Sequence, residues 1–334
     1  MIYQDEFIDA PWGKICVVCA GPKDARPVVF LHGASDTAGS FKPLVNRLPN
    51  GFRILMPELP SCGKSDPFPL GQPLFPVDHV IVLKLVAEHY KLDTFSYVGH
   101  SMGAQIGLLY HALYPNKIDR FVALDSLVYP PVEGRHFARW YEQVYDPFYD
   151  PKNYKRFTSK PESGPLYTID QALETLIRNR GLTREAGLAV LERAIVDAGN
   201  GQYRFCWEQR MKLPSVPAMS ADFQHQLYGR MRIPHLIIFA DQSIKAYVQF
   251  TWSSRPDKVR SHMLQEWIDK NPHFRAAIVE GNHDVHINSP VPVVRLVTKF
   301  LLGDELGVTS GRDVMDALKA AYEAHQPEKL HAKL

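Results

Sequence analysis

The feature that most constrains the fold is an alternation of short apolar runs with amphipathic segments. Runs typical of buried strands occupy 27–33, 52–58, 95–100, 120–126, 234–241 and 274–281. Segments with apolar residues at three- and four-residue intervals follow several of them, at 37–49, 77–91, 102–115 and 291–302. Strands separated by helices pair in parallel, with the crossover helices on both faces of the sheet. The pattern therefore predicts an α/β fold built on a mostly parallel sheet.

The first 20 residues add two more strand-like runs, IYQDEFIDA and GKICVVCA. We expect them to form a hairpin at an antiparallel edge, which brings the predicted sheet to eight strands. Cys16 and Cys19 lie in the second run, where strand alternation points their side chains to opposite faces. No second pair at metal-binding spacing supports them. We therefore interpret Cys16, Cys19, Cys62 and Cys206 as free thiols in a reducing compartment.

Composition excludes several classes of partner. Lys and Arg total 38 against 36 for Asp and Glu, so neither nucleic acid nor an anionic membrane is expected as the main partner. The first residues lack a basic region followed by an apolar run, so we expect no signal peptide. No apolar run approaches the roughly 18 residues of a transmembrane helix, so no membrane span is expected.

The segment 129–232 differs in composition from the rest of the chain. It begins VYPPVEGRHFARWYEQVYDPFYDPKNY, which is dense in aromatic residues and proline. It continues through helical, charge-rich stretches such as TIDQALETLIRNR and TREAGLAVLERAIVDAG, with no strand-like run. We predict a helical cap inserted between two strands of the sheet. The core would then comprise residues 1–128 and 233–334.

The sequence Gly99-His100-Ser101-Met102-Gly103 joins a predicted strand to a predicted helix. A turn this sharp strains its apex residue, and small residues two positions before and after avoid clashes. The apex hydroxyl then stands at a helix N-terminus, where free N–H groups and the helix dipole favour developing negative charge. The alternative is a tight turn with an incidental serine. The position between a clear strand and a clear helix favours Ser101 as a nucleophile.

A serine nucleophile needs a base, and the base needs an acid to orient it. The sequence GNHDVHINSP follows the last strand and offers two bases, His283 and His286. We predict His283, because the loop leaving the strand would carry it over the carboxyl edge of the sheet. Asp125 and Asp241 each end a strand, and either gives the chain order Ser, Asp, His. Spacing alone does not decide between these two acids.

The negative charge formed during acyl transfer needs two hydrogen-bond donors. One would be the N–H of Met102, directly after the nucleophile. The other would come from Leu31-His32-Gly33-Ala34, the loop after the first parallel strand. Gly33 lets the backbone turn close to the substrate, which leaves the Ala34 N–H pointing inward. We therefore predict an oxyanion hole formed by Ala34 and Met102.

Together these motifs resemble those of the α/β-hydrolase superfamily. LHG, MPELPSCGKSD, GHSMG and GNHDVHINSP occur in the usual order, from PWGKI to about residue 303. More narrowly, PWGKI and HGASDTAGSFKPLVNRLP look like the kraken-type branch, the serine hydrolase-like proteins. The resemblance implies a peroxisomal setting. The sequence departs from the family pattern at Ser61-Cys62-Gly63, where Gly-x-Gly is usual, and at Glu58, where Asp is usual.

The resemblance also bears on the two ambiguous roles. In the last family motif the catalytic histidine usually precedes the proline by seven positions, which implies His283 ahead of Pro290. The usual acid falls near Gln242-Ser243, where this chain has no carboxylate. Several capped relatives, including some haloalkane dehalogenases and a luciferase group, place the acid at the end of the strand before the cap. That position is Asp125, which the resemblance favours over Asp241.

A serine nucleophile implies hydrolysis of an ester, thioester or lactone through an acyl-enzyme, with neither cofactor nor metal ion. Dehalogenases and epoxide hydrolases of this fold use an aspartate nucleophile instead. The alternatives are a small-molecule receptor that keeps the pocket and a cofactor-independent luciferase or oxygenase. We expect an apolar, ester-like small-molecule substrate, because the predicted cap is rich in large rings: Trp140, Tyr141, Tyr145, Phe148 and Tyr149.

The last three residues are Ala332-Lys333-Leu334, after a charged stretch and a helix expected at about 312–325. They form a relaxed version of the Ser-Lys-Leu peroxisomal address. We therefore expect a peroxisomal import receptor as a partner, with the cytoplasm as the alternative location.

Overall fold

The computed structural model describes residues 1–126, 128–129, 131–159, 163–213, 216–229, 231–244, 271, 273–306 and 320. The helix expected at about 312–325 falls outside these ranges except for residue 320, and so does the tripeptide 332–334. Within the described ranges, no helix is both long enough and apolar enough to cross a lipid bilayer.

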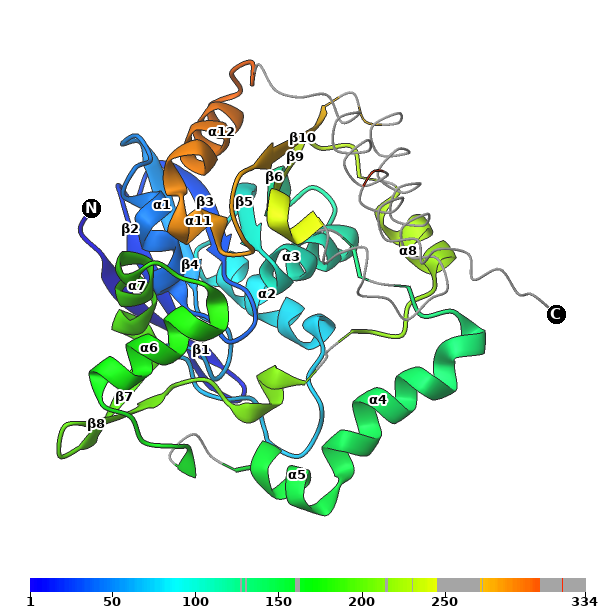
Figure 1. Ribbon diagram of the computed structural model, residues 1–334. Coiled ribbons are helices and arrows are strands. Elements are labelled where there is room, and N and C mark those ends of the chain that lie inside the picture. The colour runs from blue at the N-terminus through cyan, green and yellow to red at the C-terminus, as the bar shows by residue number, and fades with distance from the viewer. Residues whose placement is uncertain are drawn as a thin grey trace.

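One eight-stranded sheet forms the centre of the molecule (Figure 1). The strand order is β1-β2-β4-β3-β5-β6-β9-β10, with antiparallel pairing from β1 to β4 and parallel pairing from there on. This confirms the predicted mostly parallel sheet with an antiparallel edge. The strands are β1 Gln4–Ala10, β2 Gly13–Ala20, β3 Arg26–Leu31, β4 Phe52–Pro57, β5 Phe95–His100, β6 Ile118–Leu124, β9 His235–Ala240 and β10 Phe274–Val279.

The central strands are apolar on both sides because helices cover both faces of the sheet. Every residue of β5 and β9 is buried, as expected of strands that lie between two helical layers. Two separate hydrophobic clusters occupy the two faces. The first face packs against α2 Val80–His89 and α3 Met102–Leu113, and the second packs against α1 Lys42–Val45, α11 Val285–Asn288 and α12 Pro290–Leu302.

The segment predicted as the cap lies between β6 and β9 and is mainly helical. The helix α4 runs along the edge of the molecule (Figure 1). Capping side chains define several helix starts, because Thr168, Thr183 and Ser220 each accept a backbone N–H in the first turn. The cap helices are α4 Phe137–Tyr149, α5 Pro151–Phe157, α6 Ile169–Arg180, α7 Arg184–Ala194 and α8 Ala221–Tyr228.

The expectation that no strand interrupts the cap is wrong. The helix α7 ends at Ala194, and β7 Ile195–Gly199 pairs with β8 Gln202–Phe205 as an antiparallel hairpin. The turn has positive φ angles at Asn200 and Gly201, which is the conformation that an Asn-Gly hairpin turn requires. The helical periodicity of the preceding residues concealed this signal.

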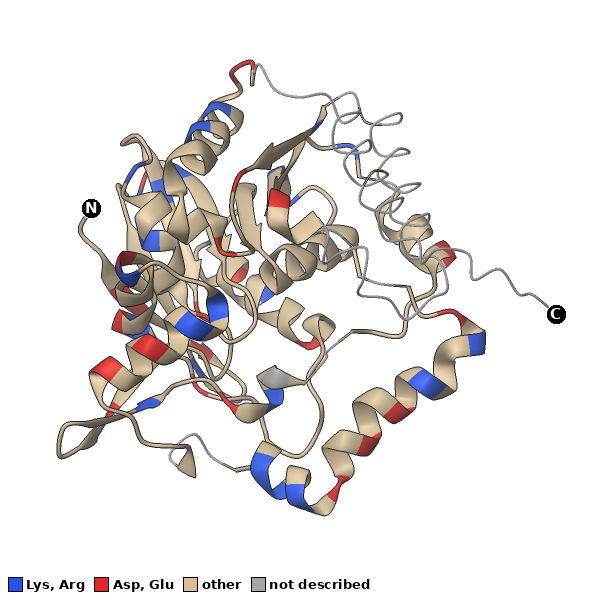
Figure 2. Ribbon diagram, in the orientation of Figure 1, with Lys and Arg blue, Asp and Glu red and all other residues tan. Residues whose placement is uncertain are grey.

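Buried arginines attach the cap to the core. Arg193 of α7 forms a two-point contact with Glu58, Nε to Oε1 at 2.7 Å and Nη2 to Oε2 at 2.8 Å. Arg210 pairs with Glu208 and donates to carbonyl oxygens of the core loop at 68–72. Lys, Arg, Asp and Glu residues also lie on the outer surface of the cap helices (Figure 2). The charge-rich stretches of the cap therefore supply buried contacts as well as a solvated surface.

Candidate active site

Ser101 occupies a strained turn between β5 and α3. Its backbone has φ 51° and ψ −121°, a conformation that costs a residue with a Cβ about 1–3 kcal/mol. The glycines on either side are needed because the turn is tight. A Cβ at Gly99 would lie 2.5 Å from the backbone of Ala104, and one at Gly103 would lie 2.1 Å from the Leu31 carbonyl oxygen.

The Ser101 hydroxyl is not used to cap the helix. Ser101 is the N-cap residue of α3 but makes no side-chain capping bond, although serine usually does so at this position. Its hydroxyl makes no hydrogen bond to any other described residue. The strained turn therefore presents an uncommitted hydroxyl at the positive end of a 12-residue helix.

Asp125 and His283 are brought together across 158 positions of sequence. Asp125 directly follows β6, is fully buried and has φ 45°. Its Oδ1 accepts the N–H of Ala240 at 2.8 Å, and its Oδ2 lies 2.6 Å from Nδ1 of His283. The Ser101 N–H donates to the Leu124 carbonyl at 3.1 Å, so the turn and the acid lie on neighbouring strand ends.

The side chain of His283 is 47% exposed. Partial burial lowers the pKa of His283, but the hydrogen bond and charge of Asp125 outweigh this effect and raise the pKa above its ordinary value. The His283 carbonyl accepts from Nε2 of His100, the residue before the nucleophile, at 2.9 Å. This bond joins the histidine loop to the nucleophile turn. Free enzymes often hold base and nucleophile apart until substrate binds.

The two competing candidates, His286 and Asp241, lie elsewhere. His286 is fully buried, with its ring 4.0 Å from that of His100 and 5.4 Å from that of Phe41. Burial lowers the pKa of His286 well below its usual value, as expected of a neutral packed ring. Asp241 Oδ1 accepts the N–H of Gly281 at 2.8 Å, so its carboxylate fixes the start of the histidine loop.

The predicted oxyanion loop lies against the nucleophile. A Cβ at Gly33 would lie 3.1 Å from Cβ of Ser101, so only glycine allows this approach without a shift. No hydrogen bond from the Ala34 N–H occurs within the described part of the chain. Met102 is the first residue of α3, where the helix itself offers no acceptor for the N–H. Two backbone donors near Ser101 are therefore available.

Comparisons with known proteins show the family to which the chain belongs. The model of the alpha/beta hydrolase fold family matches residues 26–290. The chain belongs to the α/β-hydrolase fold family. It is 28% identical over 293 residues to "Serine hydrolase-like protein" of Danio rerio, covering 87% of this chain and 86% of that protein. Both predicted resemblances, to the superfamily and to the serine hydrolase-like proteins, are thus confirmed.

Two further likenesses cover most of the chain. "Esterase YbfF" of Escherichia coli (strain K12) is 24% identical, covering 82% of this chain and 92% of that protein. The crystal structure of a hypothetical protein from Pseudomonas aeruginosa PAO1 matches with a TM-score of 0.74 at 24% identity, covering 90% of this chain and 99% of that one. This structural likeness shows the fold alone.

Sequence reasoning about this α/β-hydrolase missed the residues that support its loops. His32 Nε2 accepts the N–H of Leu59 at 3.0 Å, so its proton lies on Nδ1, which is 2.8 Å from the Gly33 carbonyl oxygen. Asp36 and Asp284 are almost completely buried and share one cap residue, Arg180. His32 lies in LHG and Asp284 in GNHDVHINSP, but neither motif indicated these supporting contacts. The signal was chemical, because buried carboxylates require a partner.

Among the described residues, one group could hold a metal ion: Asp36, His100 and His286, whose potential ligand atoms lie within 4.8 Å of one another. Both oxygens of Asp36 already accept hydrogen bonds from the Arg180 guanidinium, at 3.2 and 3.1 Å. A cation here would compete with that fixed positive charge. The arrangement therefore favours an ion pair over a metal centre.

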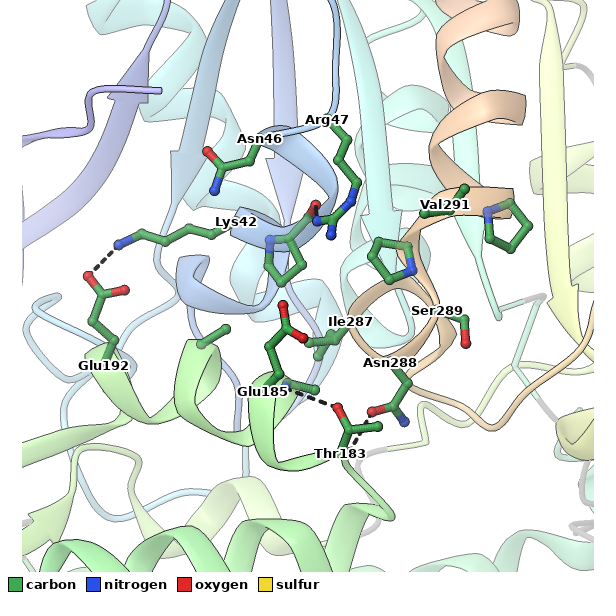
Figure 3. Close-up of a pocket in the computed structure, with 15 residues that line it drawn as sticks. Lys42, Asn46, Arg47, Thr183, Glu185, Glu192, Ile287, Asn288, Ser289 and Val291 are labelled. Carbon is green, nitrogen blue, oxygen red and sulfur yellow. Dashed lines mark hydrogen bonds and ion pairs between the residues drawn. The ribbon is translucent and has the colours of Figure 1, made fainter.

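Two surface pockets that border the cap lie away from Ser101. A cavity of about 560 Å³ between α1, α7 and the start of α12 has Lys42, Arg47, Glu185 and Glu192 on its walls (Figure 3). Lys42 pairs with Glu192 across it. A second cavity of about 800 Å³ lies between the loop at 68–75 and the cap. Neither contains Ser101, Asp125 or His283.

The five cap rings proposed to form a substrate pocket divide into two groups. Trp140 and Phe148 are buried in the cap core, whereas Tyr145 and Tyr149 line the 800 Å³ cavity. The Tyr141 ring stacks on Tyr145 at 4.7 Å and is 46% exposed. Trp140 and Phe148 therefore stabilise the cap, and the three tyrosines are the rings that a molecule outside the core could reach.

Proposed function

We propose that the protein is a serine hydrolase that cleaves an ester, thioester or lactone bond. Ser101 is the nucleophile, His283 the base, Asp125 the orienting acid, and the N–H groups of Ala34 and Met102 the oxyanion donors. The proposal rests above all on the 2.6 Å contact between His283 and Asp125, beside a strained serine whose hydroxyl caps nothing. A serine used only in a tight turn has no need of this pair.

The proposed reaction has two halves. In the first, the Ser101 hydroxyl passes its proton to Nε2 of His283 while Oγ attacks the acyl carbon. The resulting oxyanion accepts the two backbone N–H groups. Collapse breaks the bond to the alcohol or thiol, which leaves with the proton from His283. In the second half, His283 takes a proton from water, the hydroxide attacks the acyl-enzyme, and the acid is released with Ser101 restored.

The pKa of His283 suits this role. Asp125 stabilises the imidazolium that forms when the proton arrives, and it fixes the tautomer by accepting from Nδ1. Nε2 is then the nitrogen without a proton in the resting enzyme, as a base requires. The relatives named as a serine hydrolase-like protein and as an esterase support the same chemical class.

The test compares Ser101→Ala with the wild-type protein. We expect wild type to hydrolyse p-nitrophenyl esters and to be labelled by a fluorophosphonate probe. Ser101→Ala should lose labelling completely, and its kcat should fall by about 10⁴-fold or more. A screen of acyl chain lengths that includes acyl-CoA thioesters would then define the substrate class.

Ser61→Ala is a matched control. Ser61 is also buried, at 3% exposure, and also has a positive φ, 64°, but it takes no part in the proposed mechanism. It should label and turn over ester as wild type does. Wild-type protein that neither labels nor hydrolyses any ester would contradict the proposal and favour a receptor. Turnover that survives Ser101→Ala would contradict the assignment of the nucleophile.

A further inference from the structure

Arg180, the last residue of α6 in the cap, holds two carboxylates of the core at once. Its Nη1 and Nη2 donate to the two oxygens of Asp36 at 3.2 and 3.1 Å. Its Nε donates to Oδ2 of Asp284 at 3.0 Å, and Nη2 also donates to Oδ1 of that residue. Exposed fractions of 1% for the Asp36 side chain and 5% for Asp284 show that both charges are withdrawn from water. The rigid guanidinium fork suits such paired contacts.

These two carboxylates stand beside the two loops that the proposed reaction uses. Asp36 lies two residues after Ala34, the proposed oxyanion donor, and Asp284 directly follows His283, the proposed base. The loops come from distant parts of the chain, after β3 and after β10. Arg180 therefore bridges, through a single side chain, the group that would hold the oxyanion and the group that would move the proton.

The backbone around Arg180 is also tied to the histidine loop. Asn282 Nδ2 donates to the carbonyls of Arg180 and Gly181, at 3.1 and 3.0 Å. Asn288 Nδ2 donates to the Gly181 carbonyl at 3.0 Å, and its Oδ1 accepts the Thr183 N–H at 2.9 Å. Gly181 has φ 63°, and a Cβ there would lie 2.9 Å from Asn282 Nδ2. The turn between α6 and α7 is thus shaped to fit this loop.

We propose that Arg180 is a positioning residue, which sets the distance between the oxyanion loop at 33–36 and the histidine loop at 281–288 and so makes catalysis depend on a docked cap. The proposal rests on the proposed hydrolase function, since it concerns the same site. Arg180 acts through Asp36 and Asp284 and takes no part in the chemical steps.

Arg193 provides a matched comparison. It also lies in the cap, is 7% exposed, and forms a two-point contact with the fully buried Glu58. Its other ionic partner is Asp5 in β1, far from the histidine loop in sequence. Replacing either arginine leaves a buried carboxylate without its partner, which typically costs about 3–5 kcal/mol. Glu58 also accepts the Ala38 N–H at 3.3 Å, two residues beyond the oxyanion loop at 33–36. The comparison therefore rests on the histidine loop at 281–288, which only the loss of Arg180 should loosen.

The first experiment uses hydrogen exchange, which does not depend on activity. In Arg180→Gln, we expect amides of 33–36 and 281–288 to exchange about tenfold faster than in wild type or more. In Arg193→Gln, the amides of 281–288 should match wild type while exchange rises around β1 and Glu58. If Arg180→Gln does not fold, Arg180→Lys keeps the charge without the fork and should show the same pattern. Unchanged exchange in both loops, or equal changes in the two arginine variants, would overturn the proposal.

The second experiment measures ester turnover. A displacement of about 1 Å between reacting groups costs roughly a hundredfold in rate. We therefore expect Arg180→Gln to lower kcat by about that factor with KM changed only a few-fold, and Arg180→Lys to recover part of the loss. Arg193→Gln should keep kcat near wild type at a temperature where it is folded. A fall in Tm with normal kcat for both variants would mean that Arg180 only docks the cap.

The pH dependence of kcat/KM gives a further test, because the direction of its shift is predicted for each variant. The charged groups that face His283 are Asp125, Asp284 and Arg180, and the rings of His100 and His286 are held neutral by burial. Removing Arg180 deletes a positive charge that lowers the pKa of His283, so the acid limb of kcat/KM should move to higher pH. Asp284→Asn should move it to lower pH. Shifts of the same sign in both variants would contradict the geometry.

Different outcomes would refute the hydrolase proposal and the positioning role of Arg180. Wild-type protein without labelling or turnover would refute the hydrolase proposal, and hydrogen exchange would still decide whether Arg180 holds the two loops together. Turnover in wild type together with normal kcat in Arg180→Gln would refute the positioning role alone.

Discussion

Replacing Ser101 by glycine should abolish activity and at the same time make the protein more stable. The backbone at φ 51° and ψ −121° strains any residue with a Cβ by about 1–3 kcal/mol. Glycine removes that strain but loses about 0.5–1 kcal/mol more through the entropy of the unfolded chain. We therefore expect a net gain of about 1 kcal/mol in the free energy of unfolding, which for a chain of 334 residues raises Tm by about 1–2 °C.

Ser101→Ala separates the backbone effect from the loss of the hydroxyl. Alanine removes Oγ but keeps Cβ in the same turn, so the strain persists. Because the hydroxyl makes no hydrogen bond to a described residue, its removal should change the free energy of unfolding by no more than about 0.5 kcal/mol. The difference between Ser101→Gly and Ser101→Ala then reports the strain at this one position.

The assay is calorimetric unfolding of the three proteins under identical conditions, with fluorophosphonate labelling in parallel. Wild type should label and neither variant should. The expected order of Tm is Ser101→Gly above Ser101→Ala, with Ser101→Ala close to wild type. A glycine variant that unfolds at or below the Tm of the alanine variant would refute the claim that the turn stores strain.

Two further predictions concern the acid and the C-terminal tripeptide. Asp125→Asn should lower kcat by about 10⁴-fold, as loss of the orienting acid does in other serine enzymes. It should also move the acid limb of kcat/KM to lower pH, because Asp125 raises the pKa of His283. Asp241→Asn keeps an acceptor for the Gly281 N–H, and its kcat should stay within about tenfold of wild type. A fluorescent protein that ends in residues 326–334 should enter peroxisomes, and Leu334→Ala should leave it in the cytoplasm.

Local patterns predicted the sheet because each strand carries its own signal. A central strand of a parallel sheet is apolar on both sides, and β5 and β9 are buried at every position, so short apolar runs sufficed. The hairpin of β7 and β8 was missed because the periodicity of α7 continues up to Ala194 and the deciding signal was a single Asn200-Gly201 turn. No residue of β7 or β8 is fully buried, so the pair carries little apolar pattern.

The nucleophile turn was predictable because its backbone geometry restricts the sequence. The pairing of acid and base was much less predictable, because the two residues are distant in the sequence. Gly99 and Gly103 mark the turn at Ser101, because no other residue fits against the carbonyl and backbone atoms there. The partner of His283 lies 158 positions away, and spacing alone left two acids open. Their distinction depends on which strand end faces the histidine loop, a property of strand order.

Arg180 illustrates why the remainder of the site lay beyond sequence reasoning. A charged residue near the end of an amphipathic helix is usually solvated, and the stretch ending at Arg180 reads as an ordinary surface helix. Yet Arg180, Arg193 and Arg210 all place their guanidinium groups against buried carboxylates. Moving the cap away from the core would leave Asp36, Asp284 and Glu58 as unpaired charges, and such an opening is costly unless water or a ligand replaces the guanidinium groups. Of these contacts, only those of Arg180 reach both loops beside Ser101, and on the positioning proposal the same ion pairs serve cap docking and the geometry of the site.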